Sequence, residues 1–268
     1  MSCAAYALGL QGEVNLRHHK LTLTQWPTVE SGRNIPPLRL GFASDFHAGP
    51  LTSHQLLVEA LDMLEMQKPD VVLLGGDYVT GHAYNINPLC SLLERFCPPL
   101  GIYAVLGNHD LCTDDVHIVT QLEKTGVHVL MNANIRLPPP YDGISICGIE
   151  ETEYGNPSVS QTLKDASQTR ILLMHSPNGV HLFNDEQIDL VLCGHTHGGQ
   201  IVLPNGFAPY IPQPEGCRKY AHGCFDLPRQ KGHLLVSRGI GCSLLPVRFL
   251  AQPEVHLCEI HSNGALNN

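Results

Sequence analysis

Short apolar runs recur along the chain, and most of them end in a small cluster of polar residues. The runs at 38–43, 71–74 and 102–106 each have the length of one buried strand. Apolar residues at helical spacing lie between them and predict three helices: one capped by Thr52 or Ser53 and running to about Gln67, one over 88–96, and one from Thr113 to about Gly126. Alternating strands and helices of this kind are typical of a parallel sheet in an α/β protein.

After Val127 the pattern changes to shorter strands joined by Asn, Pro and Gly turns. A helix is predicted over 157–166, and another begins at Ser176-Pro177. The predicted strands of this half are 129–130, 135–137, 144–149, 171–174 and 189–193, with 201–203, 234–237 and 255–260 completing a second set. We therefore predict a four-layer α/β/β/α sandwich, in which two packed mixed β-sheets are flanked by helices.

The two ends of the chain differ in character from this central region. Residues 1–37 are interpreted as an N-terminal lead-in, in which 20–25 alternates like an edge strand before prolines interrupt it. A single domain is expected over 38–261, followed by a loose polar tail at 262–268. The apolar stretch 2–10 is shorter than the ~20 residues that span a bilayer and lacks the basic start of a signal peptide. It is also compatible with the stub of a removed anchor.

The net charge and the cysteine content limit the possible functions and the possible cellular compartments of the protein. The formal net charge of −9 argues against a general nucleic-acid surface, although metal ions can supply positive charge locally for a phosphate. The ten cysteines include no Cys-x-x-Cys pair, so most are expected to be free thiols in a reducing compartment. A cytoplasmic location is expected, with a membrane-associated or exported protein as the alternative. Cys217 and Cys224 flank a predicted hairpin, and their redox state stays open.

The polar clusters at the strand ends contain the residue types that bind metals. Asp45 and Asp77 lie 32 positions apart, and Asp77 and Asn108 lie 31 apart, which is the length of one strand–helix–strand unit. Each cluster is therefore expected at the same edge of a parallel sheet. Later strands end at His175 and at His195-Thr196-His197, whose alternate rings can point to one location. Together these clusters hold two carboxylates, one carboxamide and five imidazoles: Asp45, His47, Asp77, Asn108, His109, His175, His195 and His197.

This mixture of imidazole and carboxylate suits divalent ions such as Mn, Fe or Zn. It contains more ligands than one tetrahedral zinc site uses. This set could bind two ions that share one bridging carboxylate. In enzymes that transfer phosphoryl groups, two such metal ions lie about 3.5–4 Å apart.

Five of these blocks resemble the signature of the calcineurin-like metallophosphoesterase superfamily, in order and in spacing, from about 38 to 260. They are Asp45-x-His47, Gly76-Asp77, Gly107-Asn108-His109-Asp110, His175 and Gly194-His195-Thr196-His197. Further stretches resemble the bacterial YaeI/YkuE-type phosphodiesterases: Lys68-Pro69-Asp70, Gly75-Gly76-Asp77-Tyr78-Val79, 194–200, Ser237-Arg238-Gly239-Ile240-Gly241 and Pro253-Glu254-Val255.

The resemblance implies two divalent metal ions, with Mn²⁺ expected first and Zn²⁺ or Fe as alternatives. It assigns Asp45, His47 and His197 to one ion, assigns Asn108, His175 and His195 to the other, and makes Asp77 the bridge. A hydroxide held by both ions would attack phosphorus, and His109 would stabilise the phosphoryl oxygens or protonate the leaving group. Related phosphatases orient this histidine with an Asp three residues after the bridge. Thr80 occupies that position here, so the partner of His109 is open.

Several functions fit this interpretation. The expected one is a metal-dependent phosphodiesterase that acts on a small phosphoester. One alternative is a pyrophosphatase that cleaves lipid-linked nucleotides such as UDP-sugar-lipid envelope intermediates, which an apolar groove beside the metals and possible contact with a membrane would favour. A third hypothesis is that the protein is a non-catalytic scaffold that binds metal. Asn108 and Arg238 are candidates for substrate binding, although Arg238 could equally pair with a carboxylate.

Overall fold

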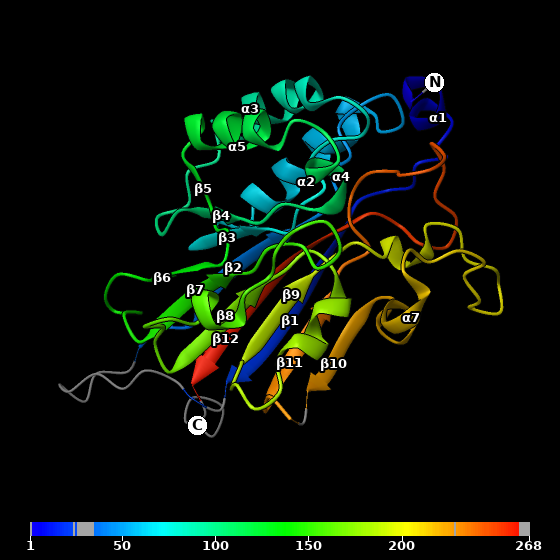
Figure 1. The fold of residues 1–268 in the computed structure, drawn as a ribbon. Coiled ribbons are helices and arrows are strands. Elements are labelled where there is room, and N and C mark those ends of the chain that lie inside the picture. The colour runs from blue at the N-terminus through cyan, green and yellow to red at the C-terminus, as the bar shows by residue number, and fades with distance from the viewer. Residues whose placement is uncertain (1, 24, 26–34, 228, 263–268) are drawn as a thin grey trace.

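The computed structural model describes residues 2–23, 25, 35–227 and 229–262 and contains two six-stranded sheets packed face to face (Figure 1). The strands of the first sheet are β1 (Asn15–Leu23), β2 (Leu38–Ala43), β3 (Val71–Leu74), β4 (Ile102–Ala104), β5 (Val127–Val129) and β12 (Glu254–Ser262), in the order β1-β12-β2-β3-β4-β5. The strands of the second are β6 (Ala133–Arg136), β7 (Ile144–Gly148), β8 (Thr169–Leu173), β9 (Leu190–Cys193), β10 (Gly223–Leu227) and β11 (Gly232–Val236), in the order β10-β11-β9-β8-β7-β6.

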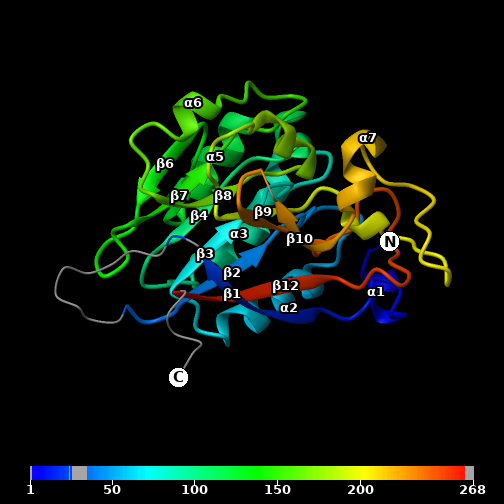
Figure 2. The same ribbon diagram turned by 90° about the horizontal axis from the view of Figure 1, so that it is seen from below.

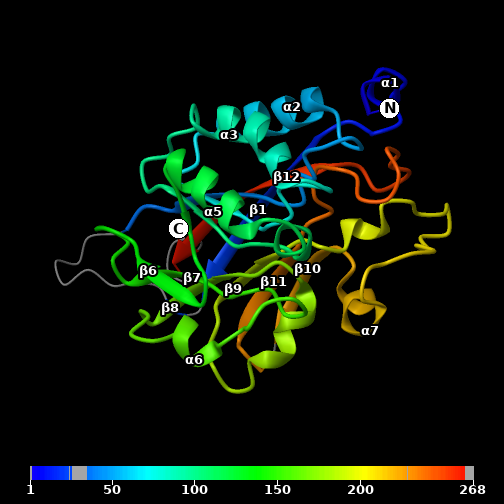
Figure 3. The same ribbon diagram turned by 45° about the horizontal axis from the view of Figure 1, so that its top comes forward.

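Helices cover the outer faces of both sheets. The α-helices of the described residues are α1 (Ser2–Ala7), α2 (His54–Glu65), α3 (Asn87–Leu93), α4 (Asn108–Leu111), α5 (Asp115–Lys124), α6 (Val159–Thr162) and α7 (Pro214–Cys217). Short 3₁₀ segments are η1 (Ala83–Ile86), η2 (Pro177–Leu182), η3 (His197–Gly199) and η4 (Arg218–Tyr220). In Figures 1 and 3, α2, α3 and α5 lie over the first sheet, and Figure 3 shows α6 beyond the second.

Three hydrophobic cores separate the four layers. On β3, Val71 and Leu73 point into the core between the sheets, whereas the alternate residues Val72 and Leu74 point toward the helices. The third core lies on the outer face of the second sheet, where Val191 and Cys193 of β9 pack with residues around η2. Because β3 and β9 are buried on both faces, they are continuously apolar, as the sequence indicated. The predicted α/β/β/α sandwich with mixed sheets is confirmed.

Strand direction brings the polar clusters to one edge. β2, β3, β4 and β5 run parallel to one another, and so do β7, β8, β9 and β11. The antiparallel pairs are β12 with β2, β6 with β7, and β10 with β11, which makes both sheets mixed. The carboxyl ends of β2, β3 and β4 therefore meet those of β8 and β9, where open α/β sheets commonly place their sites.

Some local predictions were wrong. Residues 201–203 form no strand, because Ile201 makes an isolated bridge to Phe249 and Pro204 can donate no further backbone bond. The strand expected at 255–260 is β12, and it lies in the first sheet rather than in the second set (Figure 2). Asp114, not Thr113, caps α5, since its side chain accepts the N–H of His117. The helix expected at 157–166 is reduced to the single turn of α6.

The lead-in and the tail are described in part. The lead-in contributes β1, which lies parallel to β12 at the edge of the first sheet (Figure 2). Pro27 and the tail from 263 onward lie outside the described residues. All ten cysteines are free thiols, Cys217 and Cys224 included. Within the described residues, no helix combines the length and the apolar character needed to cross a membrane.

Candidate metal centre

All eight polar residues predicted from the strand ends lie at the edge where the two sheets meet. Their donor atoms form three overlapping groups, in each of which all atoms lie within 4.8 Å of one another: Asp45 with His47 and His197, His47 with Asp77 and His109, and Asp77 with His175 and His195. Asn108 joins the third group, because its Oδ1 lies 3.1 Å from His175 Nε2 and 3.0 Å from His195 Nδ1. The structure thus brings together side chains that are up to 152 positions apart.

Asp77 lies at the centre of this arrangement. Its Oδ2 is 3.4 Å from Nε2 of His47 on one side and 3.3 Å from Nε2 of His175 on the other. Nε2 of His47 is in turn 2.9 Å from Nε2 of His197. One carboxylate oxygen therefore faces donors from both halves of the cluster, which is the position a bridging ligand would need.

The hydrogen bonds of His175 show that this point requires positive charge. Its Nδ1 lies 2.8 Å from the carbonyl oxygen of Gly75, which can only accept, so Nδ1 carries a proton. Nε2 then faces the oxygens of Asp77 and Asn108, which are acceptors as well. Burial opposes protonation of this ring, yet the charge of Asp77 raises the pKa of His175 to about 10. A proton or a cation at Nε2 resolves the conflict between the acceptors.

Asp45 presents an oxygen that the protein leaves without a partner. Its Oδ1 accepts the backbone N–H of His195 at 2.9 Å, but its buried Oδ2 has no hydrogen-bond partner. Burial raises the pKa of Asp45 to about 6, and the charge of Asp77 adds to that effect. Buried polar atoms are nearly always paired, because leaving one unpaired costs about 1–3 kcal/mol. The free oxygen fits a cation held by Asp45, His47 and His197.

Burial also keeps three of the imidazoles in the form that binds metals. It lowers the pKa of His47 and His195 to about 3, and it lowers that of His197 well below its ordinary value. These rings are therefore neutral at pH 7, and a neutral ring can offer a lone pair to a cation. The donor set of neutral imidazoles, carboxylates and one carboxamide fits divalent transition ions.

The backbone at the cluster is unusual, because five of the candidate ligands adopt left-handed conformations without being glycine. Their φ angles are 53° for Asp45, 45° for His47, 55° for Asp77, 69° for His195 and 53° for His197. Such residues cost about 1–3 kcal/mol each and persist only where the surroundings hold them in place. The strain lies on the turns that carry the candidate ligands, and strained backbone of this kind is commonly found at functional sites.

The side chain that holds the central turn is Asp110. Its buried carboxylate accepts the backbone N–H groups of Gly107, Asp77, Tyr78 and Val79 at 2.9, 2.8, 2.8 and 3.3 Å. Asp110 therefore fixes the loop after β3 to the loop after β4. Although Asp110 directly follows His109, the hydrogen bonds of its carboxylate go to the backbone and not to that ring.

Other residues hold individual rings. Thr80 Oγ1 lies 2.7 Å from Nδ1 of His47, so this position holds the ring of a candidate ligand rather than that of His109. Arg248, only 4% exposed, lies with Nη2 3.1 Å from Nδ1 of His197 and donates to the carbonyl oxygens of Gly241 and Ala251. No sequence pattern around Arg248 indicated this contact. It could be found only from the folded chain.

Two glycines let the loops approach the carboxylates. A Cβ on Gly194 would collide with the carboxylate of Asp45, and one on Gly107 would collide with that of Asp77. Glycine is therefore required at both positions by close contact with a proposed ligand, whatever the backbone angles. This explains why Gly precedes both His195 and Asn108.

His109 lies at the rim of the cluster. Its backbone N–H donates to Oδ1 of Asp77 at 2.9 Å, and its ring meets that of His47 edge-on, with centroids 4.7 Å apart. No hydrogen bond to the His109 ring occurs within the described part of the chain. The half-buried ring is thus placed by packing beside the candidate ligands and can present a nitrogen to a bound molecule.

Arg238 lies away from the pocket wall. Its side chain pairs with Glu254, whose Oε2 is 3.4 Å from Nη1, and its backbone N–H donates to Oε1 of the same residue. This is the carboxylate-paired alternative considered for Arg238. Its role in substrate binding stays a prediction, and the pairing does not favour it.

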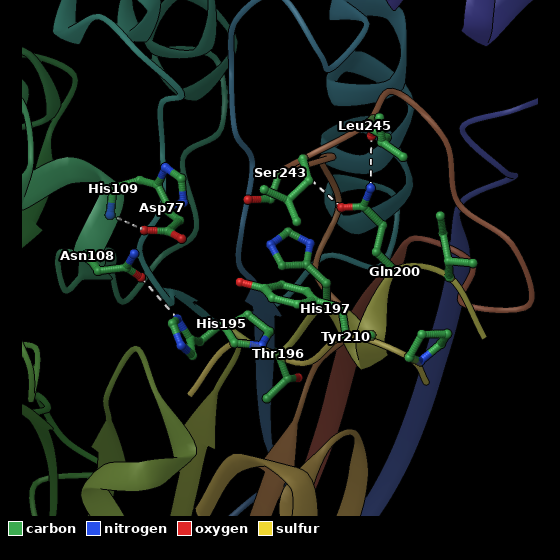
Figure 4. A pocket seen from close by; sticks show the side chains of 15 residues that line it. Asp77, Asn108, His109, His195, Thr196, His197, Gln200, Tyr210, Ser243 and Leu245 are labelled. Atoms are coloured by element: carbon green, nitrogen blue, oxygen red, sulfur yellow. Dashed lines mark hydrogen bonds between the residues drawn. The ribbon is translucent and has the colours of Figure 1, made fainter. Parts of the chain in front are cut away.

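A pocket of about 380 Å³ opens directly beside the cluster. Its lining includes Asp77, Asn108, His109, His195 and His197, and most of the other lining residues are apolar and are called the apolar wall: Ile201, Pro209, Tyr210, Pro212, Leu244 and Leu245. Figure 4 shows Asp77, Asn108 and His109 facing Gln200 and Leu245 across the view. Gln200 ties the apolar wall together, because it donates to the carbonyl oxygen of Leu245 and accepts the N–H of Ser243.

Comparison with known proteins agrees with this geometry. Residues 38–199 match the calcineurin-like phosphoesterase family. The phosphodiesterase YaeI of Escherichia coli K12 is 30% identical over 85% of this chain and 83% of its own length. The uncharacterized metallophosphoesterase YkuE of Bacillus subtilis 168 is also 30% identical, over 82% of this chain and 78% of its own.

One solved structure shares the fold. The crystal structure of TT1561 of Thermus thermophilus superposes with a TM-score of 0.50 over 76% of this chain and 90% of that chain, at 11% identity. The ordered motifs, the convergent donor atoms and these matches lead to one assignment. The chain belongs to the calcineurin-like phosphoesterase family and is a metal-dependent phosphoester hydrolase.

Proposed function

We propose that the protein is a phosphodiesterase with a dinuclear metal centre. Asp45, His47 and His197 would hold one ion, and Asn108, His175 and His195 would hold the second. Asp77 would bridge the two. The observation that carries this proposal is the position of Asp77 Oδ2, which lies 3.4 Å from a ring nitrogen of the first set and 3.3 Å from one of the second.

A pair of divalent cations would neutralise phosphate charge and lower the pKa of a water molecule enough for attack on phosphorus near neutral pH. The chain's own contribution is to orient the reactants. Asn108 adds a neutral oxygen to the second set without adding charge. His109, which lines the pocket beside Asp77, is placed to stabilise a phosphoryl oxygen or to give a proton to the leaving alcohol.

The substrate is expected to be a small phosphodiester, as the name of the E. coli relative suggests for that protein. A second candidate is a diester or pyrophosphate with an apolar group, such as a lipid-linked nucleotide. The apolar wall of Ile201, Tyr210, Leu244 and Leu245 favours it. The ten free thiols favour a location in a reducing compartment such as the cytoplasm.

The proposal is tested with bis-p-nitrophenyl phosphate as the substrate. Protein stripped with a chelator should not hydrolyse it, and Mn²⁺ should restore turnover and bind at two ions per chain. Zn²⁺ and Fe²⁺ are compared in the same assay, because affinity alone does not decide the native metal. The matched variants are Asp77→Asn, which should lose both ions, and Asp226→Asn, an exposed carboxylate that should change nothing. Full turnover by stripped protein would disprove the metal mechanism, and one ion per chain would disprove the dinuclear centre.

A further inference from the structure

Large exposed hydrophobic side chains gather on three segments, two of which contribute residues to the pocket lining. The described residues contain fifteen exposed large hydrophobics, and nine of them lie on three segments. We call these nine the apolar rim: Leu8, Leu10, Leu203, Phe207, Tyr210, Leu244, Leu245, Phe249 and Leu250. Leu8 is 74% exposed and Leu244 is 61% exposed, so these side chains meet solvent rather than a core. Such a concentration on one face commonly marks an interaction surface.

Hydrogen bonds between the three segments hold the rim together as one surface. The backbone N–H of Arg248 donates to the carbonyl oxygen of Leu10 at 2.7 Å, and that of Val202 donates to Phe249 at 2.9 Å. In Figures 1 and 3, α1, the loop before α7 and the loop before β12 lie on the same side of the molecule. Residues separated by more than 230 positions therefore present one apolar face.

The rim is continuous with the candidate metal centre. Tyr210, Leu244 and Leu245 belong to the rim and also line the pocket that contains Asp77 and His109. A molecule whose apolar part lies on the rim can therefore place a phosphate in the pocket. The arrangement suits an amphiphilic phosphoester better than a fully polar one.

The distribution of charge indicates what covers the rim. The chain has 25 acidic residues and a net charge of −9, yet segments 2–12, 200–214 and 239–253 contain no Asp or Glu. The exposed Arg218 lies over the ring of Phe207, 5.8 Å from its centroid, and Lys219 follows it. The three segments contain apolar side chains and no carboxylates of their own, cations lie nearby, and the exposed Glu13 and Glu215 follow only at segment ends. This face complements an anionic phospholipid surface, which would repel the rest of this protein.

We propose that the apolar rim docks on the surface of a phospholipid bilayer and presents the pocket to phosphodiesters whose apolar group is anchored in the lipid. The substrate part of this inference rests on the proposed function, whereas the docking part does not. Burial of the rim in the headgroup region would remove its side chains from water, which is the driving force for such contact.

The first test measures sedimentation with vesicles of phosphatidylcholine containing phosphatidylglycerol. Wild-type protein should pellet with them, and Leu8→Glu with Phe207→Glu should weaken binding by about tenfold or more, since each change removes an apolar contact and adds a negative charge. The matched control is Met66→Glu with Val116→Glu, which are 70% and 71% exposed but lie at the end of α2 and on α5. Absence of vesicle binding by the wild type, or equal loss in both double variants, would overturn the proposal.

The second test compares two chromogenic diesters. The rim variant is Leu8→Glu with Phe207→Glu. It should hydrolyse hexadecyl p-nitrophenyl phosphate carried in vesicles about tenfold more slowly than the wild type does. It should hydrolyse soluble bis-p-nitrophenyl phosphate at the wild-type rate. A parallel fall on both substrates would overturn the substrate part. Loss of all hydrolysis with vesicle binding intact would refute the proposed function and leave docking standing. If the wild type is a dimer that the rim variant converts to a monomer, with no binding to vesicles, a second copy covers the rim and the proposal fails.

Discussion

The substitution Asp110→Asn tests how the fold holds the strained turn of the proposed bridging ligand. The carboxylate of Asp110 accepts four backbone N–H groups with its two oxygens. Asparagine keeps one oxygen and replaces the other with an NH₂ group, which is itself a donor. At least one pair of N–H groups then loses its acceptor and faces a donor instead.

The expected loss of stability follows from the number of N–H groups that lose their acceptor. Each buried N–H left without an acceptor costs about 1–3 kcal/mol, so the loss of two should lower the free energy of unfolding by about 2–6 kcal/mol. That is a large part of the roughly 5–15 kcal/mol typical of a domain. The effect should also reach the site, because Asp77, at φ 55°, loses one of the bonds that hold its turn. We expect weaker binding of Mn²⁺ and a turnover reduced at least tenfold.

Urea unfolding and Mn²⁺ titration measure the two effects separately. Saturating Mn²⁺ should recover part of the lost stability, because it binds the folded state alone. Asp114→Asn is the matched control: this exposed carboxylate caps α5, and asparagine caps a helix as well as aspartate does. The reasoning about Asp110 would be refuted by a variant with wild-type stability and wild-type affinity for Mn²⁺.

Three further predictions concern single side chains. Asp77→Asn should reduce the bound Mn²⁺ at both sites, which metal analysis checks; two full sites in that variant would remove the bridging role. His109→Ala should retain its metals but lose about two to four orders of magnitude in kcat, the usual contribution of an acid–base group, and an unchanged kcat would contradict its role. Glu254 is buried, which raises its pKa, but the neighbouring His256 ring, whose Nε2 lies 3.5 Å from Oε1, and the charge of Arg238 lower it to about 2 from an ordinary value of 4.5. A depressed pKa stabilises the fold above pH 4.5, so the advantage of the wild type over Glu254→Gln should be constant from about pH 8 to 5. This difference in stability should shrink as the pH falls toward 2. Urea unfolding midpoints of the wild type and of Glu254→Gln are compared between about pH 7 and 3, and a constant difference over that range would refute the prediction.

Local patterns in the sequence determined the central strands and the residues that follow them. β2 and β3 occupy the predicted ranges, because strands buried on both faces are apolar at nearly every position and can be recognised within a few residues. The candidate ligands were identifiable for the same reason, since each lies within a few positions of such a run. The order and spacing of the motifs were then sufficient to indicate the family.

Only the tertiary structure decided the features that depend on distant segments. The apolar alternation of β12 would be the same in either sheet. Its pairing with β1 and β2 places it in the first sheet. The hydrogen bonds of Asp110 and the contact of Arg248 with His197 join parts of the chain that carry no local signal for each other. The apolar rim is likewise a property of three segments brought side by side. Strand patterns reflect burial of neighbouring residues, whereas these contacts arise from the path of the whole chain.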